Sequence, residues 1–147
     1  MSKEFKGRPV IRGNVSAEAV VSHNGLNTLA TFQKSALMHK KEVIGSDQNN
    51  PDVYGKNLTG KIICLPKTIG STTGGMVLYA ICSLKMAPAA MLFSEPIDSL
   101  AAAGVILSDV WADDTIVAVD NLGQEFLDYV KDGMKITVSE DGTVVVD

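Results

Sequence analysis

The sequence has few of the residues that many specialised sites require. Its 147 residues include only two cysteines, Cys64 and Cys82, which is too few for a disulfide framework or a four-cysteine zinc site. We therefore expect a reduced, cytoplasmic setting. The net charge is −4, so no basic excess is present to neutralise a nucleic-acid backbone. The N-terminus has no apolar segment typical of a secretion signal. The nearly uncharged stretch 69–84 is too short and too polar for a membrane span.

The histidines and cysteines do not predict a metal centre. His23 and His39 are 16 residues apart with no cysteine near either, whereas zinc sites usually show closely spaced ligands. Cys64 lies in a predicted strand and Cys82 in a predicted helix, positions typical of small core residues. We therefore expect this chain to bind no metal or cofactor itself.

The second half of the chain alternates apolar runs with amphipathic segments. We expect strands at 60–66, 90–93 and 117–119, and helices at 76–84, 97–109 and 125–130. Strands separated by helices are typically parallel with right-handed crossovers. At the chain's end, Asp141-Gly142 separates two apolar runs, 135–138 and 143–146, which predicts a hairpin.

The first half is less regular. Residues 8–13 and 18–22 indicate two strands around a turn at Gly13-Asn14, which would form a second hairpin. Residues 23–57 show little periodicity and are expected to be irregular. We found no repeat and no linker, so the sequence predicts one α/β domain over residues 1–147. Its sheet should be mixed, with a parallel centre and hairpins at both ends.

The strongest chemical feature is the segment from Pro66 to Gly75. It follows a predicted core strand and opens a helix, and open α/β sheets bind ligands at that edge. Three consecutive hydroxyls, from Ser71, Thr72 and Thr73, stand among glycines. Backbone N–H groups, hydroxyls and a helix N-terminus together favour an anion such as a carboxylate or phosphate. Ordinary capping and turn formation would explain the same residues equally well.

Known fingerprints do not fit this segment. No Lys-Ser/Thr pair follows the last glycine, as a P-loop requires. Glycines at 70, 74 and 75 have neither dinucleotide-binding nor nucleophile-elbow spacing. A second turn, Glu95 to Asp98, follows another core strand at the same edge, and there Asp98 is best interpreted as a helix N-cap. Since no paired catalytic groups accompany these turns, the chain resembles one half of an enzyme.

Several short motifs, in order, resemble those of the swivel domain, or small subunit, of the aconitase X family of hydro-lyases. They are Gly7-Arg8, Thr31-Phe32, Asp47 with Asn50-Pro51, Gly60-Lys61, Pro66 through Gly74, Ala87 to Ala90, and Glu95 to Asp98. Asn50 stands where the family usually has histidine.

The resemblance implies a swivelling α/β domain that closes over a large subunit carrying an iron or iron–sulfur site. It implies that Ser71 is the base that abstracts the substrate proton. It also implies that neighbouring residues contact a small carboxylate substrate. These expected binding residues are Gly70, Thr72, Thr73, Gly74, Thr31 and Phe32. We further expect an exposed face near Thr31, Phe32 and the Ser71 loop, where the large subunit would dock.

The sequence leaves more than one substrate open. Archaeal phosphomevalonate dehydratases have an arginine before the Gly-Ser pair, and Ile69 stands there in this chain. Arginine is a natural phosphate clamp, so its absence favours a substrate without phosphate, namely cis-3-hydroxy-L-proline. The alternatives are a phosphomevalonate dehydratase small subunit and a non-enzymatic domain that binds small anions.

Overall fold

The structure, a computed structural model, describes residues 2–37, 42–69, 74–111 and 115–147. The helices are α1 (Thr28–Leu37), α2 (Gly74–Ser83), α3 (Ser99–Trp111) and α4 (Gln124–Tyr129). The strands are β1 (Lys3–Lys6), β2 (Arg8–Ile11), β3 (Val15–Val21), β4 (Leu26–Asn27), β5 (Ile62–Leu65), β6 (Thr68–Ile69), β7 (Ala90–Phe93), β8 (Val117–Asp120), β9 (Lys135–Val138) and β10 (Thr143–Val146). No helix in these ranges is long and apolar enough to cross a membrane.

The main sheet is mixed, as the sequence predicts. Its strand order is β1-β10-β9-β3-β5-β7-β8-β2. The central strands β3, β5, β7 and β8 are parallel, and all other pairs are antiparallel. β9 and β10 form the expected C-terminal hairpin. A separate two-stranded sheet pairs β4 with β6 in parallel.

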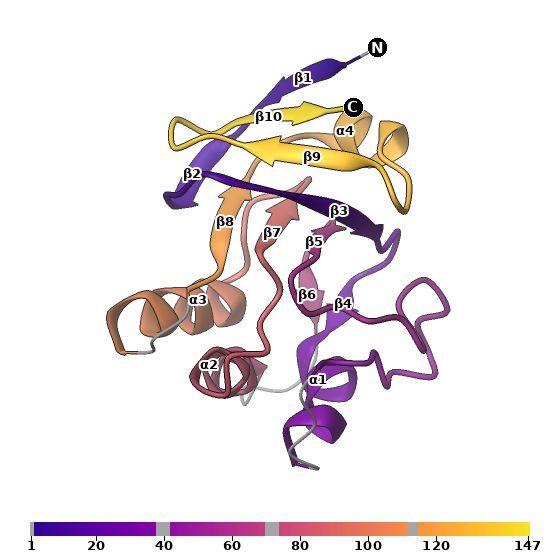
Figure 1. Cartoon of the computed structure of the whole chain (residues 1–147), viewed down its shortest axis with the longest axis vertical. Helices are drawn as coiled ribbons and strands as arrows, with labels where there is room; N and C mark the ends of the chain where they lie inside the picture. The colour runs from indigo at the N-terminus through magenta and orange to yellow at the C-terminus, as the bar shows by residue number, and fades with distance from the viewer. Residues whose placement is uncertain (1, 38–41, 70–73, 112–114) are drawn as a thin grey trace.

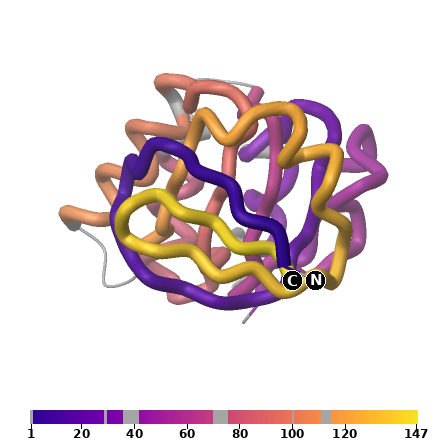
Figure 2. Tube along the Cα trace, turned by 90° about the horizontal axis from the view of Figure 1, so that it is seen from above, coloured from indigo at the N-terminus to yellow at the C-terminus, as the bar shows by residue number. Residues whose placement is uncertain are grey.

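The main sheet curls until it is a nearly closed barrel (Figure 1). β1 and β2 are its two edge strands, yet Gly7 alone separates them in the chain. The Gly7 N–H donates to the Gly142 carbonyl at 3.0 Å, which ties this corner to the β9–β10 turn. The chain termini lie side by side (Figure 2), because Lys3 pairs with Val146.

The corner at Gly142 predicts a measurable stability difference. Gly133 and Gly142 both have positive φ, but a Cβ at Gly142 would lie 2.3 Å from the Gly7 carbonyl oxygen, whereas one at Gly133 meets nothing within 4 Å. We expect Gly133→Ala to cost about 1–2 kcal/mol for backbone strain. Gly142→Ala should cost roughly 1–2 kcal/mol more, for the added clash. Urea unfolding measures the free energy of unfolding of both variants. Equal losses would show that the backbone around Gly7 and Gly142 shifts to accommodate the added Cβ.

Two hydrophobic cores lie on opposite faces of the sheet. Alternate residues of the buried strand β5 divide between them, because successive side chains of a strand point to opposite faces. Ile62 and Cys64 join the core that α4 completes, and Ile63 and Leu65 join the core on the other face. The second core packs against α1, α2 and α3, which lie along one side of the sheet (Figure 1). Burial raises the pKa of the Cys64 thiol, which suits a packing role.

Two expectations about the first half of the chain are wrong. β2 and β3 do not form a hairpin, because β2 pairs with β8 at the far edge, while β3 lies between β5 and β9. The segment 23–57 is not wholly irregular, because it contains α1. That helix begins after Asn27, whose side chain accepts a hydrogen bond from the Ala30 N–H at 3.0 Å. This is an N-cap of the usual kind.

Candidate functional site

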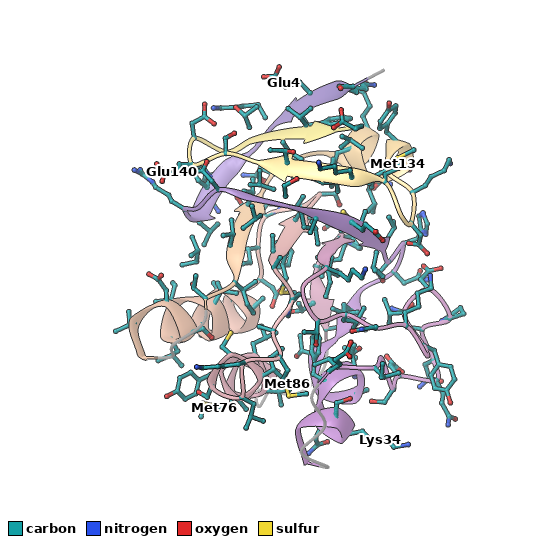
Figure 3. The ribbon with its side chains drawn as sticks, viewed as in Figure 1. Glu4, Lys34, Met76, Met86, Met134 and Glu140 are labelled. Atoms are coloured by element: carbon teal, nitrogen blue, oxygen red, sulfur yellow. The ribbon has the colours of Figure 1, made fainter. Side chains whose placement is uncertain are left out.

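The predicted loop does open a helix, because α2 begins at Gly74. β6 ends at Ile69 on the other side of the loop, and the Ile69 side chain is 46% exposed. Gly70, Ser71, Thr72 and Thr73 lie outside the described residues, so the structure defines only the two flanks of this segment. Met76 near the start of α2 and Lys34 in α1 lie at the end of the molecule opposite Glu4 and Glu140 (Figure 3).

The turns that follow the parallel strands are joined to one another. The Ser94 N–H, just after β7, donates to the Leu65 carbonyl of β5 at 3.0 Å. The Leu122 N–H, just after β8, donates to the Phe93 carbonyl at 3.1 Å, and the Gly123 N–H donates to the Ser94 carbonyl at 2.9 Å. The carboxyl ends of β5, β7 and β8 therefore form one connected edge, as the parallel arrangement predicts.

Asp98 connects two of these segments. Its carboxylate accepts a hydrogen bond from the Ala101 N–H at 3.0 Å, which confirms the predicted N-cap of α3. The same carboxylate accepts hydrogen bonds from the Thr68 N–H at 2.9 Å and the Thr68 hydroxyl at 2.5 Å. Asp98 thus joins the start of α3 to Thr68 of β6. Thr68 lies two residues before residue 70, where the undescribed part of the loop begins.

Asp120 anchors the neighbouring turn. It is 0% exposed at the end of β8 and accepts hydrogen bonds from the Arg8 guanidinium at 2.9 and 2.6 Å. Its Oδ2 also accepts the Ile97 N–H at 2.7 Å. The hydrogen bonds to Asp120 raise the pKa of Arg8. Sequence reasoning missed this pair, although a carboxylate that ends an apolar strand is a signal that could have found it.

Thr31 and Phe32 lie in α1 and are both fully buried. Phe32 belongs to the core beneath the helices, so the exposed face expected near this pair does not include these two side chains. Their contact with substrate stays a prediction. α1 does begin next to the described residues that lead into the loop, because β4 just before it pairs with β6. The Leu26 N–H of β4 donates to the Lys67 carbonyl at 2.9 Å.

Among the described residues, the buried hydroxyls of Thr31 and Ser94 have no hydrogen-bond partner. A buried hydroxyl without a partner costs free energy. Such groups are uncommon in native proteins and often lie at functional positions. Ser94 follows β7 directly, and Thr31 lies in the first turns of α1.

Asp47 and Asn50, both buried, shape the turn between α1 and β5. Asp47 accepts the Asn49 N–H at 2.9 Å, and the Asn50 amide donates to the Ser22 hydroxyl at 3.0 Å. This second bond ties the turn to the end of β3.

His23 contacts one carboxylate, Asp52, with 3.2 Å between Nδ1 and Oδ2. The His23 backbone N–H donates to the same carboxylate and lowers the pKa of Asp52. In the described ranges no group of three or more His, Cys, Asp or Glu side chains could hold a metal ion. His39 lies outside those ranges. A surface cavity of about 300 Å³ borders His23, Asp52, Asp128 and Asp132 and includes none of the described residues that we predict to bind substrate.

Comparison with known proteins places this architecture in a family. The model of the aconitase X swivel domain matches residues 4–146. The phosphomevalonate dehydratase small subunit of Thermococcus kodakarensis is 30% identical, with 94% of this chain and 91% of that protein covered. The phosphomevalonate dehydratase small subunit of Methanocella arvoryzae is 32% identical, with 95% and 94% covered.

Solved structures agree with the sequence relatives. The crystal structure of Thermococcus kodakaraensis aconitase X in its holo-form has a TM-score of 0.81 at 30% identity, covering 99% of this chain and 98% of that one. The solution structure of a UPF0107 protein has a TM-score of 0.75 at 24% identity, covering 97% of each chain, and supports the fold alone. From the match over residues 4–146 and the relatives at 30% identity or more, we conclude that this chain belongs to the aconitase X swivel-domain family.

Proposed function

We propose that this chain is the small subunit of an aconitase X-type dehydratase and that segment 66–75 contributes to an active site shared with a large subunit. The observation that carries the proposal is the family match over residues 4–146, which covers nearly the whole chain. The position of the segment supports it, because its described flanks lie at the edge where β5, β7 and β8 end. Ligands of open α/β folds bind at such an edge.

Dehydration of a 3-hydroxy acid removes a proton from the carbon beside the carboxylate and hydroxide from the next carbon. We assign the proton abstraction to Ser71. A serine hydroxyl is a weak base, so its alkoxide needs stabilisation by nearby donors. The N-terminus of α2, which begins at Gly74, supplies partial positive charge close to Ser71 in the chain. Thr72 and Thr73 are candidate donors to the alkoxide or to the substrate carboxylate.

The described residues do not fit an iron or iron–sulfur centre. They contain no cluster of ligand side chains, and both cysteines are buried in core elements. We therefore assign no step in this chain to iron and propose that the large subunit carries any such centre.

Phosphomevalonate is the first candidate substrate. The relatives from Thermococcus and Methanocella are both named phosphomevalonate dehydratase small subunits. These names favour phosphomevalonate over cis-3-hydroxy-L-proline, the substrate that the sequence pattern favours. One observation supports cis-3-hydroxy-L-proline as the second candidate substrate. Ile69, where the resemblance would place an arginine, is an exposed apolar side chain that cannot pair with a phosphate.

Turnover by the reconstituted complex tests the proposal. We expect the complex of this chain with its large subunit to have a kcat/KM for phosphomevalonate roughly 10²-fold or more above that for cis-3-hydroxy-L-proline. A site built around the polar groups of one substrate leaves those groups unpaired with the other. The measurement is the formation of the unsaturated acid, with each subunit alone as a control. The reverse preference supports the second candidate, and turnover of neither substrate would contradict the proposed function.

A further inference from the structure

We propose that Asp98 is a positioning residue of the dehydratase, which acts by holding Thr68, three residues before Ser71 in the sequence. The inference deepens the proposed function and rests on it for its catalytic consequence. Its structural part, the hold on Thr68, stands on geometry alone. Asp98 touches no reacting atom in this proposal, because it acts through the backbone that leads to Ser71.

The hydrogen bonds of Asp98 exceed those of an ordinary N-cap. A cap needs one side-chain oxygen near the N–H of the third helical residue, which is Ala101 here. Oδ2 accepts the hydrogen bond from that N–H and also accepts one from the Thr68 hydroxyl at 2.5 Å. Oδ1 accepts the Thr68 N–H at 2.9 Å. Among the described residues, two of the three hydrogen bonds that this carboxylate accepts therefore come from a residue 30 positions away in the chain.

The hydrogen bonds to Asp98 matter for the position of Thr68 because the strand that contains Thr68 is short. β6 has two residues and, in the described part of the chain, pairs only with the two-residue strand β4, outside the main sheet. A strand pair this short contributes little stability by itself. Asp98 is itself fixed, because the preceding Ile97 N–H donates to the fully buried Asp120 at 2.7 Å. A continuous series of contacts therefore runs from Asp120 of β8 through Asp98 to Thr68 of β6.

The catalytic consequence follows from the short distance in sequence between Thr68 and Ser71. A base must lie within hydrogen-bond reach of the proton that it abstracts. A displacement of about 1 Å can cost about 10²-fold in rate. If Thr68 is released, the segment that carries Ser71 loses a fixed starting point. Substrate contacts made by the large subunit remain, so kcat should fall more than KM rises.

Substitutions can separate the positioning role from the capping role. Asp98→Ser keeps a preferred N-cap residue but is too short to reach both groups of Thr68. Thr68→Val removes the hydroxyl and leaves the cap intact. Asp98→Asn keeps the length of the side chain, but its amide nitrogen cannot accept a hydrogen bond, so it should fall between Asp98→Ser and the wild type. Ser99→Ala, at the next position and exposed, is the matched control.

Two measurements on the whole chain and its complex test the proposal. In the full chain, the Thr68 amide of Asp98→Ser should exchange with deuterium at least about tenfold faster, while the Ser22 amide, bonded to the Cys64 carbonyl, stays protected. In the reconstituted complex, Asp98→Ser and Thr68→Val should each lower kcat about 10–100-fold, with KM within about threefold. The double variant should have a kcat no lower than that of the worse single variant, because both substitutions act on the same contact between Asp98 and Thr68.

The outcomes that overturn the inference are distinct from those that overturn the proposed function. If the Thr68 amide of Asp98→Ser exchanges with deuterium at the wild-type rate, Asp98 does not hold Thr68, whatever the activity of the complex. Faster exchange with unchanged kcat shows that the hold does not position the base. A loss of kcat in Ser99→Ala as large as in Asp98→Ser would assign the effect to the helix start. A wild-type complex without dehydratase activity overturns the proposed function and leaves the exchange result standing.

Discussion

Ser71→Ala is expected to lower kcat of the reconstituted complex about 10²–10⁴-fold while KM changes only severalfold. A general base acts in the transition state, whereas a residue that only binds the substrate carboxylate contributes equally to the ground state. Steady-state kinetics of the complex with the preferred substrate measures both parameters. The iron content of the complex should not change, which distinguishes a lost base from a collapsed site.

Thr72→Val and Thr73→Val are the matched controls for Ser71→Ala. Each removes one hydroxyl that would support the alkoxide or the carboxylate, a contact worth roughly 1–3 kcal/mol when buried. Their effects on kcat/KM should therefore be milder than that of Ser71→Ala. An intact kcat with weaker binding in Ser71→Ala would make Ser71 a substrate ligand, and the base would then belong to the large subunit.

Phe32→Ala is expected to reduce the free energy of unfolding by about 3–5 kcal/mol, the usual cost of truncating a buried phenylalanine. Phe32 is 0% exposed and packs in the core beneath α1, α2 and α3. Urea unfolding of the isolated chain, followed by circular dichroism, measures the change.

Phe32→Leu separates packing from substrate contact. Leucine keeps most of the apolar volume, so this variant should recover most of the stability. If Phe32 acts only through packing, the Phe32→Leu complex keeps the wild-type KM. A raised KM with recovered stability would support the substrate contact that the family resemblance implies. Unchanged stability of Phe32→Ala would contradict the buried position.

The parts of the fold that could be predicted are those with a strong local pattern. β5, β7 and β8 are apolar runs. Pro66 follows the end of β5, and Pro88 lies two residues before the start of β7. The β9–β10 hairpin follows from Asp141-Gly142 between two alternating runs. The start of α2 at Gly74 follows from the change from glycine and hydroxyl residues to an apolar helical pattern.

The parts that could not be predicted depend on distant partners or on polar residues in buried positions. Three buried positions of α1 are the polar residues Thr28, Thr31 and Ser35, so they interrupt the apolar stripe by which a helix is found from sequence. β2 pairs with β8, more than a hundred residues further along the chain, and no local pattern reports such a pairing.

The candidate site divides in the same way. The loop and the Asp98 cap have local signatures, because small polar residues before a helix are typical of its start. The bonds from Asp98 to Thr68 and from Asp120 to Arg8 arise only when the chain closes. Sequence alone therefore points to the segments that carry the site, and the fold adds the contacts between them.

Titration of a purified large subunit with this chain tests the shared active site most directly. Dehydratase activity should be absent from either protein alone, should rise with added chain, and should stop rising at a fixed ratio of the two. The Ser71→Ala chain should bind the large subunit with the same affinity by calorimetry and restore almost no activity. A large subunit that is fully active alone, or that does not bind this chain, would contradict a shared site.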